Sequence, residues 1–206
     1  MRSLQVLAML MIISAPTFAA DPDPTFDDAQ KGTTPLGPLR TFLEQYVGEC
    51  SDPSAGKACE ERAAEFRKQT KGKRFYMRVD GEAATMLSPG RFDASSGSHT
   101  VQVTPFFSAG GLALTHGAPK KTDAQGNPVM PLLYAEGTTP PDWSESRFQR
   151  LFSSRELSVD VIFTPQALWA LPKRGGGKIQ GVKAKVEVIR VTTARGGEAV
   201  GAWYGR

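Results

Sequence analysis

The chain has 206 residues, 22% of them charged and 9% aromatic, and its formal net charge at pH 7 is +4. This length suffices for one domain that buries about 70% of the surface of its unfolded chain, so a second domain is not needed. The positive bias is weak and the aromatic residues are not interleaved with the basic run, which argues against a nucleic-acid partner.

Residues 1–19 have the pattern of a secretory signal peptide. An apolar run over residues 4–13 follows one arginine and is succeeded by small residues. The run is about half as long as the roughly 20 residues that a membrane-spanning helix needs. Cleavage after Ala19 places Thr17 and Ala19 at the two positions that require small side chains. We therefore expect an exported, soluble mature chain, periplasmic or extracellular, with no integral membrane anchor.

The mature chain is expected to begin with an unstructured segment. Cleavage would remove Arg2 and no acidic residue, which leaves a formal charge of +3. Residues 20–34 carry four aspartates and are predicted to be disordered. Residues 35–206 are predicted to form a single α+β domain, with a helical hairpin over 35–72 and a β-rich part with one inserted helix over 73–206.

Two amphipathic helices are predicted around the only two cysteines of the chain. The first begins at Pro38 and ends at Cys50, because apolar residues recur at steps of three and four. The second begins at Pro53, carries Cys59 on its apolar face and ends at about Lys71. A tight turn between the helices brings the two thiols together, and an exporting compartment favours their oxidation. We therefore predict a Cys50–Cys59 disulfide that staples the helical hairpin.

The alternatives for this cysteine pair are weaker. A redox pair would have its thiols two residues apart beside a strand, whereas Cys50 and Cys59 stand nine positions apart. A zinc site needs about four ligands, and the two histidines, His99 and His116, lie far away in the sequence. The sequence therefore predicts neither a metal nor a cofactor.

From Lys73 onward, apolar and polar residues alternate, as is typical of half-buried strands. Six or seven strands are predicted, in residues 74–80, 99–104, 111–117, 129–137, 156–165, 181–193 and 198–205. Pro131 makes the fourth of these an edge strand, and the change of phase after Val188 in the sixth predicts a β-bulge. A helix is predicted within residues 140–154, where Asp142 and Glu145 have capping-box spacing.

The order of these elements defines the predicted fold. Two helices are followed by about four strands, one helix and about three strands. A parallel sheet would need helices between most of its strands. We therefore predict an α+β fold in which the disulfide-stapled N-terminal helical hairpin packs on an antiparallel six- or seven-stranded twisted sheet or partly closed barrel.

Candidate catalytic groups are few. The sequence has no Gly-x-Ser-x-Gly window of the kind that serine hydrolases use. Residues 174–186 lack the hydroxyl residue that follows Gly-Lys in phosphate-binding loops, and we interpret their beginning as a flexible basic loop. Asp160 is unusual because it lies in the middle of the most apolar strand. It is either solvated or held in a cleft, and we expect it to be solvated.

Candidate binding residues are basic and aromatic. Lys173, Arg174 and Lys178 lie in the basic loop, and Trp143 and Trp169 could stack on sugar rings or peptide side chains if they were exposed. Residues 173–206 carry eight basic and two acidic residues, a charge that could meet an acidic polymer or an anionic lipid. The other interpretation is a solvated β-face for the basic residues and core packing for the tryptophans, and it is the one we expect.

Two long stretches resemble uncharacterised secreted proteins of the myxobacterial type, a domain of unknown function. They are residues 39–79, which hold both cysteines and the strand GKRFYMRV, and residues 156–191. The resemblance carries no assigned activity, so it implies no catalytic residue. The bias towards Ala, Gly, Arg and Pro agrees with a GC-rich bacterial source.

These observations favour an exported, periplasmic, non-enzymatic module. It would bind an envelope protein or a surface polymer through its sheet and through the basic loop at residues 173–178. The first alternative is a cell-envelope hydrolase that uses Asp160 and a second carboxylate in a cleft. The second alternative is a structural component of an outer-surface assembly, which would form large oligomers. The sequence does not define the ligand or the oligomeric state.

Overall fold

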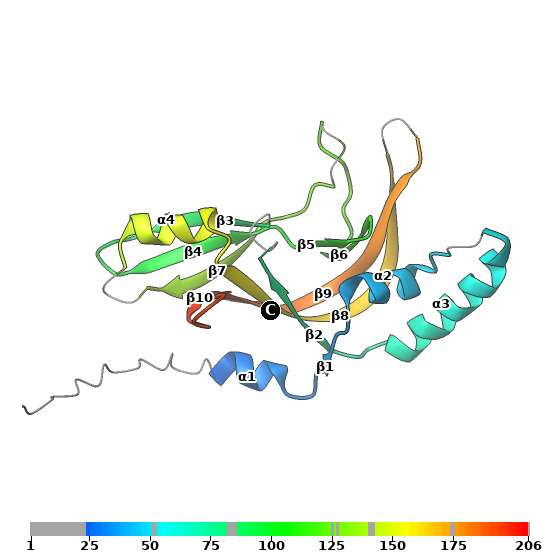
Figure 1. The fold of residues 1–206 in the computed structure, drawn as a ribbon, viewed down its shortest axis with the longest axis horizontal. Coiled ribbons are helices and arrows are strands. Elements are labelled where there is room, and N and C mark those ends of the chain that lie inside the picture. The colour runs from blue at the N-terminus through cyan, green and yellow to red at the C-terminus, as the bar shows by residue number, and fades with distance from the viewer. Residues whose placement is uncertain are drawn as a thin grey trace, which may run out of the picture.

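The fold combines a large sheet with helices on both of its faces (Figure 1). The computed structural model describes residues 24–50, 53–81, 86–124, 126, 128–139, 143–173 and 176–205. The helices are α1 (Pro24–Gln30), α2 (Leu39–Val47), the 3-10 turn η1 (Pro53–Ala55), α3 (Gly56–Thr70) and α4 (Glu145–Ser153). The strands are β1 (Thr34–Pro35), β2 (Phe75–Asp80), β3 (Leu87–Phe92), β4 (Ser98–Val103), β5 (Phe106–Ala109), β6 (Leu112–His116), β7 (Leu133–Thr138), β8 (Leu157–Pro172), β9 (Lys178–Thr193) and β10 (Ala199–Tyr204). The predicted α+β class is confirmed.

Within the described residues, the ten strands form one mostly antiparallel sheet. Its strand order is β1-β2-β8-β9-β10-β7-β4-β3, with β6 paired to β9 and β5 to β6. Only the β1–β2 and β6–β9 pairs among them are parallel. The prediction of six or seven strands is wrong, because it missed β1, β3 and β5. The first and last of these have two and four residues, and β3 contains Pro89 and Gly90 and does not alternate.

The position of β7 corrects a second prediction. Pro131 predicts an edge strand, but β7 lies between β10 and β4 and pairs with both. The strand begins at Leu133, so Pro131 precedes the ladder and removes no hydrogen bond from it. A proline marks an edge only when it lies within the paired residues.

The longest strands, β8 and β9, form a hairpin of two 16-residue strands. Along its other edge, β9 pairs first with β6 and then with β10. Phe163 pairs with Val186 and Ile162 with Val188, so Glu187 is an extra residue in β9. This confirms the predicted β-bulge, one residue earlier than the change of phase suggested. We call residues 165–186 the β8–β9 arm and its end, at Lys173 and Lys178, the tip; in Figure 1 this part of the hairpin curves away from α4.

The main core lies between the sheet and α2. This helix presents Phe42, Leu43 and Tyr46 to the sheet, and all three are buried. The ring of Phe42 lies 5.5 Å from that of Phe75 and 6.0 Å from that of Phe163. Aromatic rings at these separations add to the free energy gained from burial, so α2 is fixed to the strands beneath it.

Helix α4 packs over β3 at the other end of the sheet (Figure 1). Its Phe148 is fully buried, and its ring lies 4.6 Å from that of His99. The helix is capped by Ser144, whose Oγ accepts a hydrogen bond from the backbone N–H of Arg147 at 3.2 Å. The predicted cap, Asp142, lies outside the described residues.

The predicted Cys50–Cys59 disulfide is confirmed. Closing a loop of about ten residues stabilises a fold by about 2.7 kcal/mol in the chain-entropy model. Helix α2 ends at Val47, three residues before Cys50, and its C-cap is Gly48, whose φ of 85° lies in the left-handed region that favours glycine. A Cβ at Gly48 would lie 3.0 Å from the Cβ of Ala63 in α3, so this glycine also permits the close approach of the two helices.

Helix α1 overturns the prediction of a disordered segment over residues 20–34. Residues 24–30 are helical and Phe26 is fully buried, while residues 20–23 lie outside the described part of the chain. The guanidinium of Arg74 donates hydrogen bonds to the carbonyls of Ala29 at 2.7 Å and Lys31 at 3.2 Å. The segment is polar enough to suggest disorder, but tertiary contacts through one phenylalanine and one arginine hold it on the sheet.

Candidate functional site

The candidate site lies on the face of β2, β8 and β9 that points away from the main core, which we call the outer face. Along β8, Val159, Val161 and Phe163 belong to the main core. Ser158 and Asp160 alternate with them and therefore point to the outer face, beneath α1. The alternation that the sequence displays thus places a carboxylate between a sheet and a helix.

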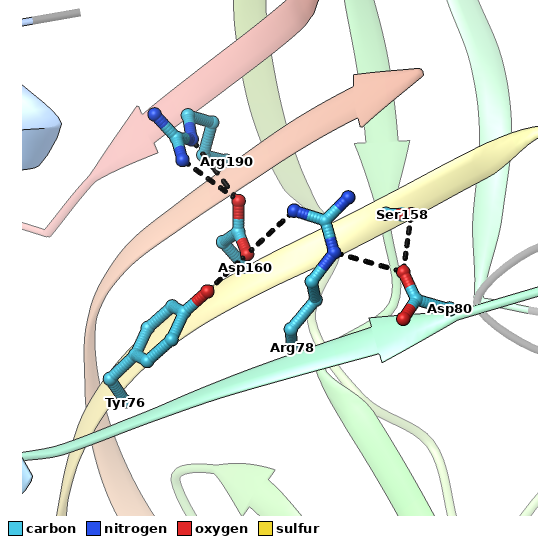
Figure 2. A network of polar contacts seen from close by, with 6 residues as sticks. All are labelled: Tyr76, Arg78, Asp80, Ser158, Asp160 and Arg190. Carbon is cyan, nitrogen blue, oxygen red and sulfur yellow. Dashed lines mark hydrogen bonds and ion pairs between the residues drawn. The ribbon is translucent and has the colours of Figure 1, made fainter. Parts of the chain in front are cut away.

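Asp160 is wholly buried and accepts hydrogen bonds on both carboxylate oxygens (Figure 2). The hydroxyl of Tyr76 donates to Oδ1 at 2.8 Å. Arg190 donates to Oδ2 through Nε at 3.2 Å and through a terminal nitrogen at 3.1 Å. Arg78 lies 3.4 Å from Oδ1. The prediction that Asp160 is solvated is therefore wrong, because two arginines compensate the charge that burial would otherwise make costly.

The network continues from Arg78 to the solvent-exposed end of β2. The Nε of Arg78 donates to Oδ1 of Asp80 at 2.9 Å, and Ser158 Oγ donates to the same oxygen at 2.6 Å. The hydrogen bond from Ser158, together with Arg78, holds the pKa of Asp80 below its usual value despite some burial. Figure 2 shows that two arginines face two aspartates, so the formal charges of the network cancel.

Strand register creates this arrangement. Arg78 in β2 lies directly opposite Asp160 in β8, which lies directly opposite Arg190 in β9. Opposite charges at directly opposed positions stabilise the pairing of neighbouring strands. The three residues therefore form one row of alternating charge across β2, β8 and β9, and a shift of register would break both pairs.

Helix α1 covers the network on the outer face of the sheet. The guanidinium carbon of Arg190 lies 3.6 Å from the centre of the Phe26 ring, a cation–π contact. The rings of Phe26 and Tyr76 form a T-shaped pair, with the centroids 6.3 Å apart. Ile162 and Val188 complete the small apolar cluster around Phe26. Phe26 therefore shields part of Arg190 and part of Tyr76 from water, and both side chains are half-buried.

The geometry limits what Asp160 can do chemically. A general base must reach the proton it removes, directly or through one water. Asp160 has no exposed surface, and its oxygens accept hydrogen bonds from Tyr76, Arg78 and Arg190. These contacts lock strands β2, β8 and β9 together and do not present the carboxylate to a substrate.

Sequence reasoning selected Asp160 but missed Tyr76, Arg78, Arg190 and Phe26. Arg78 is 82 positions from Asp160 and Arg190 is 30 positions away, so no local pattern joins them. One signal was present: Arg78 and Arg190, like Asp160, are charged residues inside alternating strands. Charges of opposite sign at such positions indicate that the strands pair.

Tyr76 provides a test of this network by pH. Burial, and then the hydrogen bond to Asp160, raise the pKa of Tyr76 to about 12, against about 10 for an ordinary tyrosine. The folded state thus holds this proton more tightly, so its contribution to stability is complete below about pH 10 and is lost as the pH rises through about 12. We expect the free energy of unfolding, measured with urea, to fall more steeply between these values in the wild type than in Tyr76→Phe. Equal slopes in the two proteins would contradict the network.

Comparison with known families gives the classification of the chain. Over residues 1–206 it matches the family described as "Family of unknown function (DUF6066)". The chain belongs to the DUF6066 family. Neither the curated proteins nor the solved structures contain a match to it. Membership of DUF6066 assigns no activity, and the resemblance to secreted myxobacterial proteins stays a prediction.

The two candidate tryptophans of this DUF6066 chain are both buried. Trp143 is 8% exposed and lies beneath the guanidinium of Arg147, 4.7 Å from the ring centre. Trp169 is 7% exposed and lies in the β8–β9 arm against Gly181, where a Cβ would come within 2.8 Å of the ring. Each ring therefore presents little surface on which a ligand could stack.

The candidate basic residues of the DUF6066 chain lie at the tip of the arm. Lys173 and Lys178 are exposed, and Arg174 lies outside the described residues. Trp143 packs beside α4, at the opposite end of the sheet from the arm (Figure 1), so the structure does not bring the predicted site residues together. Leu168, in the same arm, is 44% exposed.

The two histidines take part in packing. His99 is buried in β4, with Nε2 at the carbonyl oxygen of Val200. His116 accepts a hydrogen bond on Nδ1 from the backbone N–H of Val186 at 3.2 Å, and burial lowers the pKa of this histidine. Over the described ranges, no three His, Cys, Asp or Glu residues are grouped so that they could hold a metal ion. None of the helices described there is long and apolar enough to cross a membrane.

Proposed function

We propose that this DUF6066 protein is an exported, non-enzymatic binding module of the bacterial cell envelope, periplasmic or extracellular. The observation that carries the proposal is the β8–β9 arm. Its two strands are 16 residues long and run beyond the body of the sheet to a tip that bears the exposed Lys173 and Lys178. An arm of this form can reach a partner without any change in the core.

The charge of the arm supports this function. Residues 165–186 include four lysines and one arginine and no acidic residue. The five positive charges exceed the formal charge of +4 that the whole chain carries. A local excess of one sign attracts partners of the other sign and speeds their encounter. The arm is thus suited to an anionic component of the envelope.

Side-chain contacts fix the base of the arm to the neighbouring strands. Glu187, the bulged residue, accepts a hydrogen bond from Thr164 at 2.8 Å and pairs with Arg74, also at 2.8 Å. The row of Arg78, Asp160 and Arg190 lies immediately beyond it. A binding element that is fixed before it meets its partner loses less conformational entropy on binding. In this proposal the charge network positions the arm. This role explains why the carboxylate of Asp160 is buried.

Binding to isolated envelopes tests the proposal. The mature protein is mixed with washed envelopes of its own bacterium, and the bound fraction is measured after sedimentation. We expect Lys173→Glu/Lys178→Glu to lower the affinity at least about tenfold, because two attractive charges become repulsive. The matched control is Lys71→Glu/Lys73→Glu, which makes the same charge change at the exposed end of α3 and should bind like wild type.

Two results would contradict the proposed function. One is wild-type protein that stays in the supernatant at low ionic strength. The other is an equal loss of binding in the arm variant and in the control, which would show that total charge matters and the arm does not.

A further inference from the structure

The β8–β9 arm carries exposed apolar side chains as well as charge. Leu168, Ala170 and Pro172 follow one another at alternate positions of β8, and all three are exposed. Alternate positions of a strand share one face. Leu168 lies opposite Val182 in β9, and Pro172 lies opposite Lys178. One face of the arm therefore presents an apolar stripe that ends beside a lysine.

The rest of the protein does not cover this apolar stripe. Val182, the partner of Leu168 across the hairpin, is fully buried, whereas Leu168 is 44% exposed. The pairing of β6 with β9 extends only from Gln180 to Ala184, so among the described residues no strand pairs with β9 on that side at Lys178. An exposed apolar stripe flanked by positive charge is unfavourable in water and favourable at a surface that offers both hydrocarbon and anions.

We infer that the face of the arm formed by Leu168, Ala170, Pro172 and Lys178 docks on a bilayer that contains anionic phospholipid. Lys173 and Lys178 pair with headgroup phosphates, and Leu168 enters the boundary between headgroups and acyl chains. This inference rests on the proposed function and names the envelope component that the arm meets. A hydrated polysaccharide would satisfy the lysines but would leave Leu168 in water, so the side chains favour lipid.

Two lysines account for most of the expected affinity. Each basic residue held near an anionic membrane raises the binding constant by a factor of about 5.4, so two raise it about 30-fold. Burial of half of the Leu168 side chain adds a further factor of about five. Association of this kind is reversible and depends on ionic strength, because salt screens the charges.

Vesicle flotation of the mature protein tests the inference. The probes are vesicles of phosphatidylcholine alone, vesicles of phosphatidylcholine with phosphatidylglycerol, and lipopolysaccharide in place of phosphatidylglycerol. We expect binding to the phosphatidylglycerol vesicles and little to the neutral ones. Lys173→Gln/Lys178→Gln should lower the partition coefficient about 30-fold and Leu168→Ser about fivefold. The control Lys71→Gln/Lys73→Gln, also exposed, should bind like wild type.

The outcomes separate the inference from the proposed function. Binding to isolated envelopes without binding to any vesicle would overturn the lipid inference and leave the proposed function in place. Selective binding to lipopolysaccharide would also overturn the phospholipid inference, because the partner of the arm would then be a phosphorylated glycolipid. Equal binding to neutral and anionic vesicles, or an unchanged partition coefficient in Leu168→Ser, would exclude the docking face described. If the protein bound neither vesicles nor isolated envelopes, both the lipid inference and the proposed function would be contradicted.

Discussion

Replacing Arg190 with methionine is expected to lower the free energy of unfolding by about 3 kcal/mol, because Asp160 loses its paired donors while it stays buried. In the wild type Arg190 donates two hydrogen bonds to Oδ2 of Asp160, which is 0% exposed. Tyr76 and Arg78 contact the other oxygen and cannot replace them. Urea unfolding followed by circular dichroism at neutral pH measures the change.

Two further variants make this result specific. Arg195→Met removes an exposed arginine from the turn after β9 and should change stability by less than about 0.5 kcal/mol. In Arg190→Met/Asp160→Asn the buried charge is gone, so we expect at least half of the lost stability to return. If the double variant were less stable than Arg190→Met by the full cost of a second independent substitution, the two side chains would not be coupled.

Replacing Phe26 with alanine is expected to cost about 3 kcal/mol and to release α1 from the outer face. The Phe26 ring is 0% exposed and packs against Arg190, Tyr76, Ile162 and Val188. Truncation of a fully buried phenylalanine removes apolar contacts and leaves a cavity. Because the ring also shields Arg190, water should reach the network once the helix detaches. Limited proteolysis within residues 24–36, combined with urea unfolding, reports both effects.

The same helix supplies the control. Asp27 is exposed beside Phe26, and Asp27→Ala should leave both proteolysis and stability close to wild type. Phe26→Leu should keep most of the stability, since it retains apolar volume at the same place. If Phe26→Ala resisted protease as well as the wild type does, α1 would be held mainly by the hydrogen bonds from Arg74 to the carbonyls of Ala29 and Lys31.

Patterns that are local in sequence could be predicted. The alternation of apolar and polar residues predicted strands β8 and β9. The interruption of this alternation near Val188 predicted the bulge that lies at Glu187. The spacing of Cys50 and Cys59 gave the disulfide. In each case the signal lies within about 15 residues, over which the period of the side chains directly reflects the backbone. Most of the β-rich part was accessible in this way.

Features that depend on pairing between distant segments could not be predicted. The partners of Asp160 could not be predicted from the residues around it. The choice of neighbouring strands depends on the whole sheet. Helix α1 lacks any periodic apolar pattern, and the buried Phe26 and the contacts of Arg74 hold it on the sheet. Strand β3 contains Gly90, which allows Thr100 of β4 to approach closely, and this requirement is visible only once β4 is in place. These are effects of tertiary structure overriding local preference.

The proposed function and the lipid inference both require that the protein leave the cytoplasm. The intact mass of the protein recovered from the periplasmic or extracellular fraction of its bacterium, with and without reductant, tests this most directly. We expect a chain that begins at Ala20 and that gains two hydrogens on reduction, because Cys50 and Cys59 are joined. A chain that retains residues 1–19, found only inside the cell with two free thiols, would contradict export and remove the envelope as the partner of the arm.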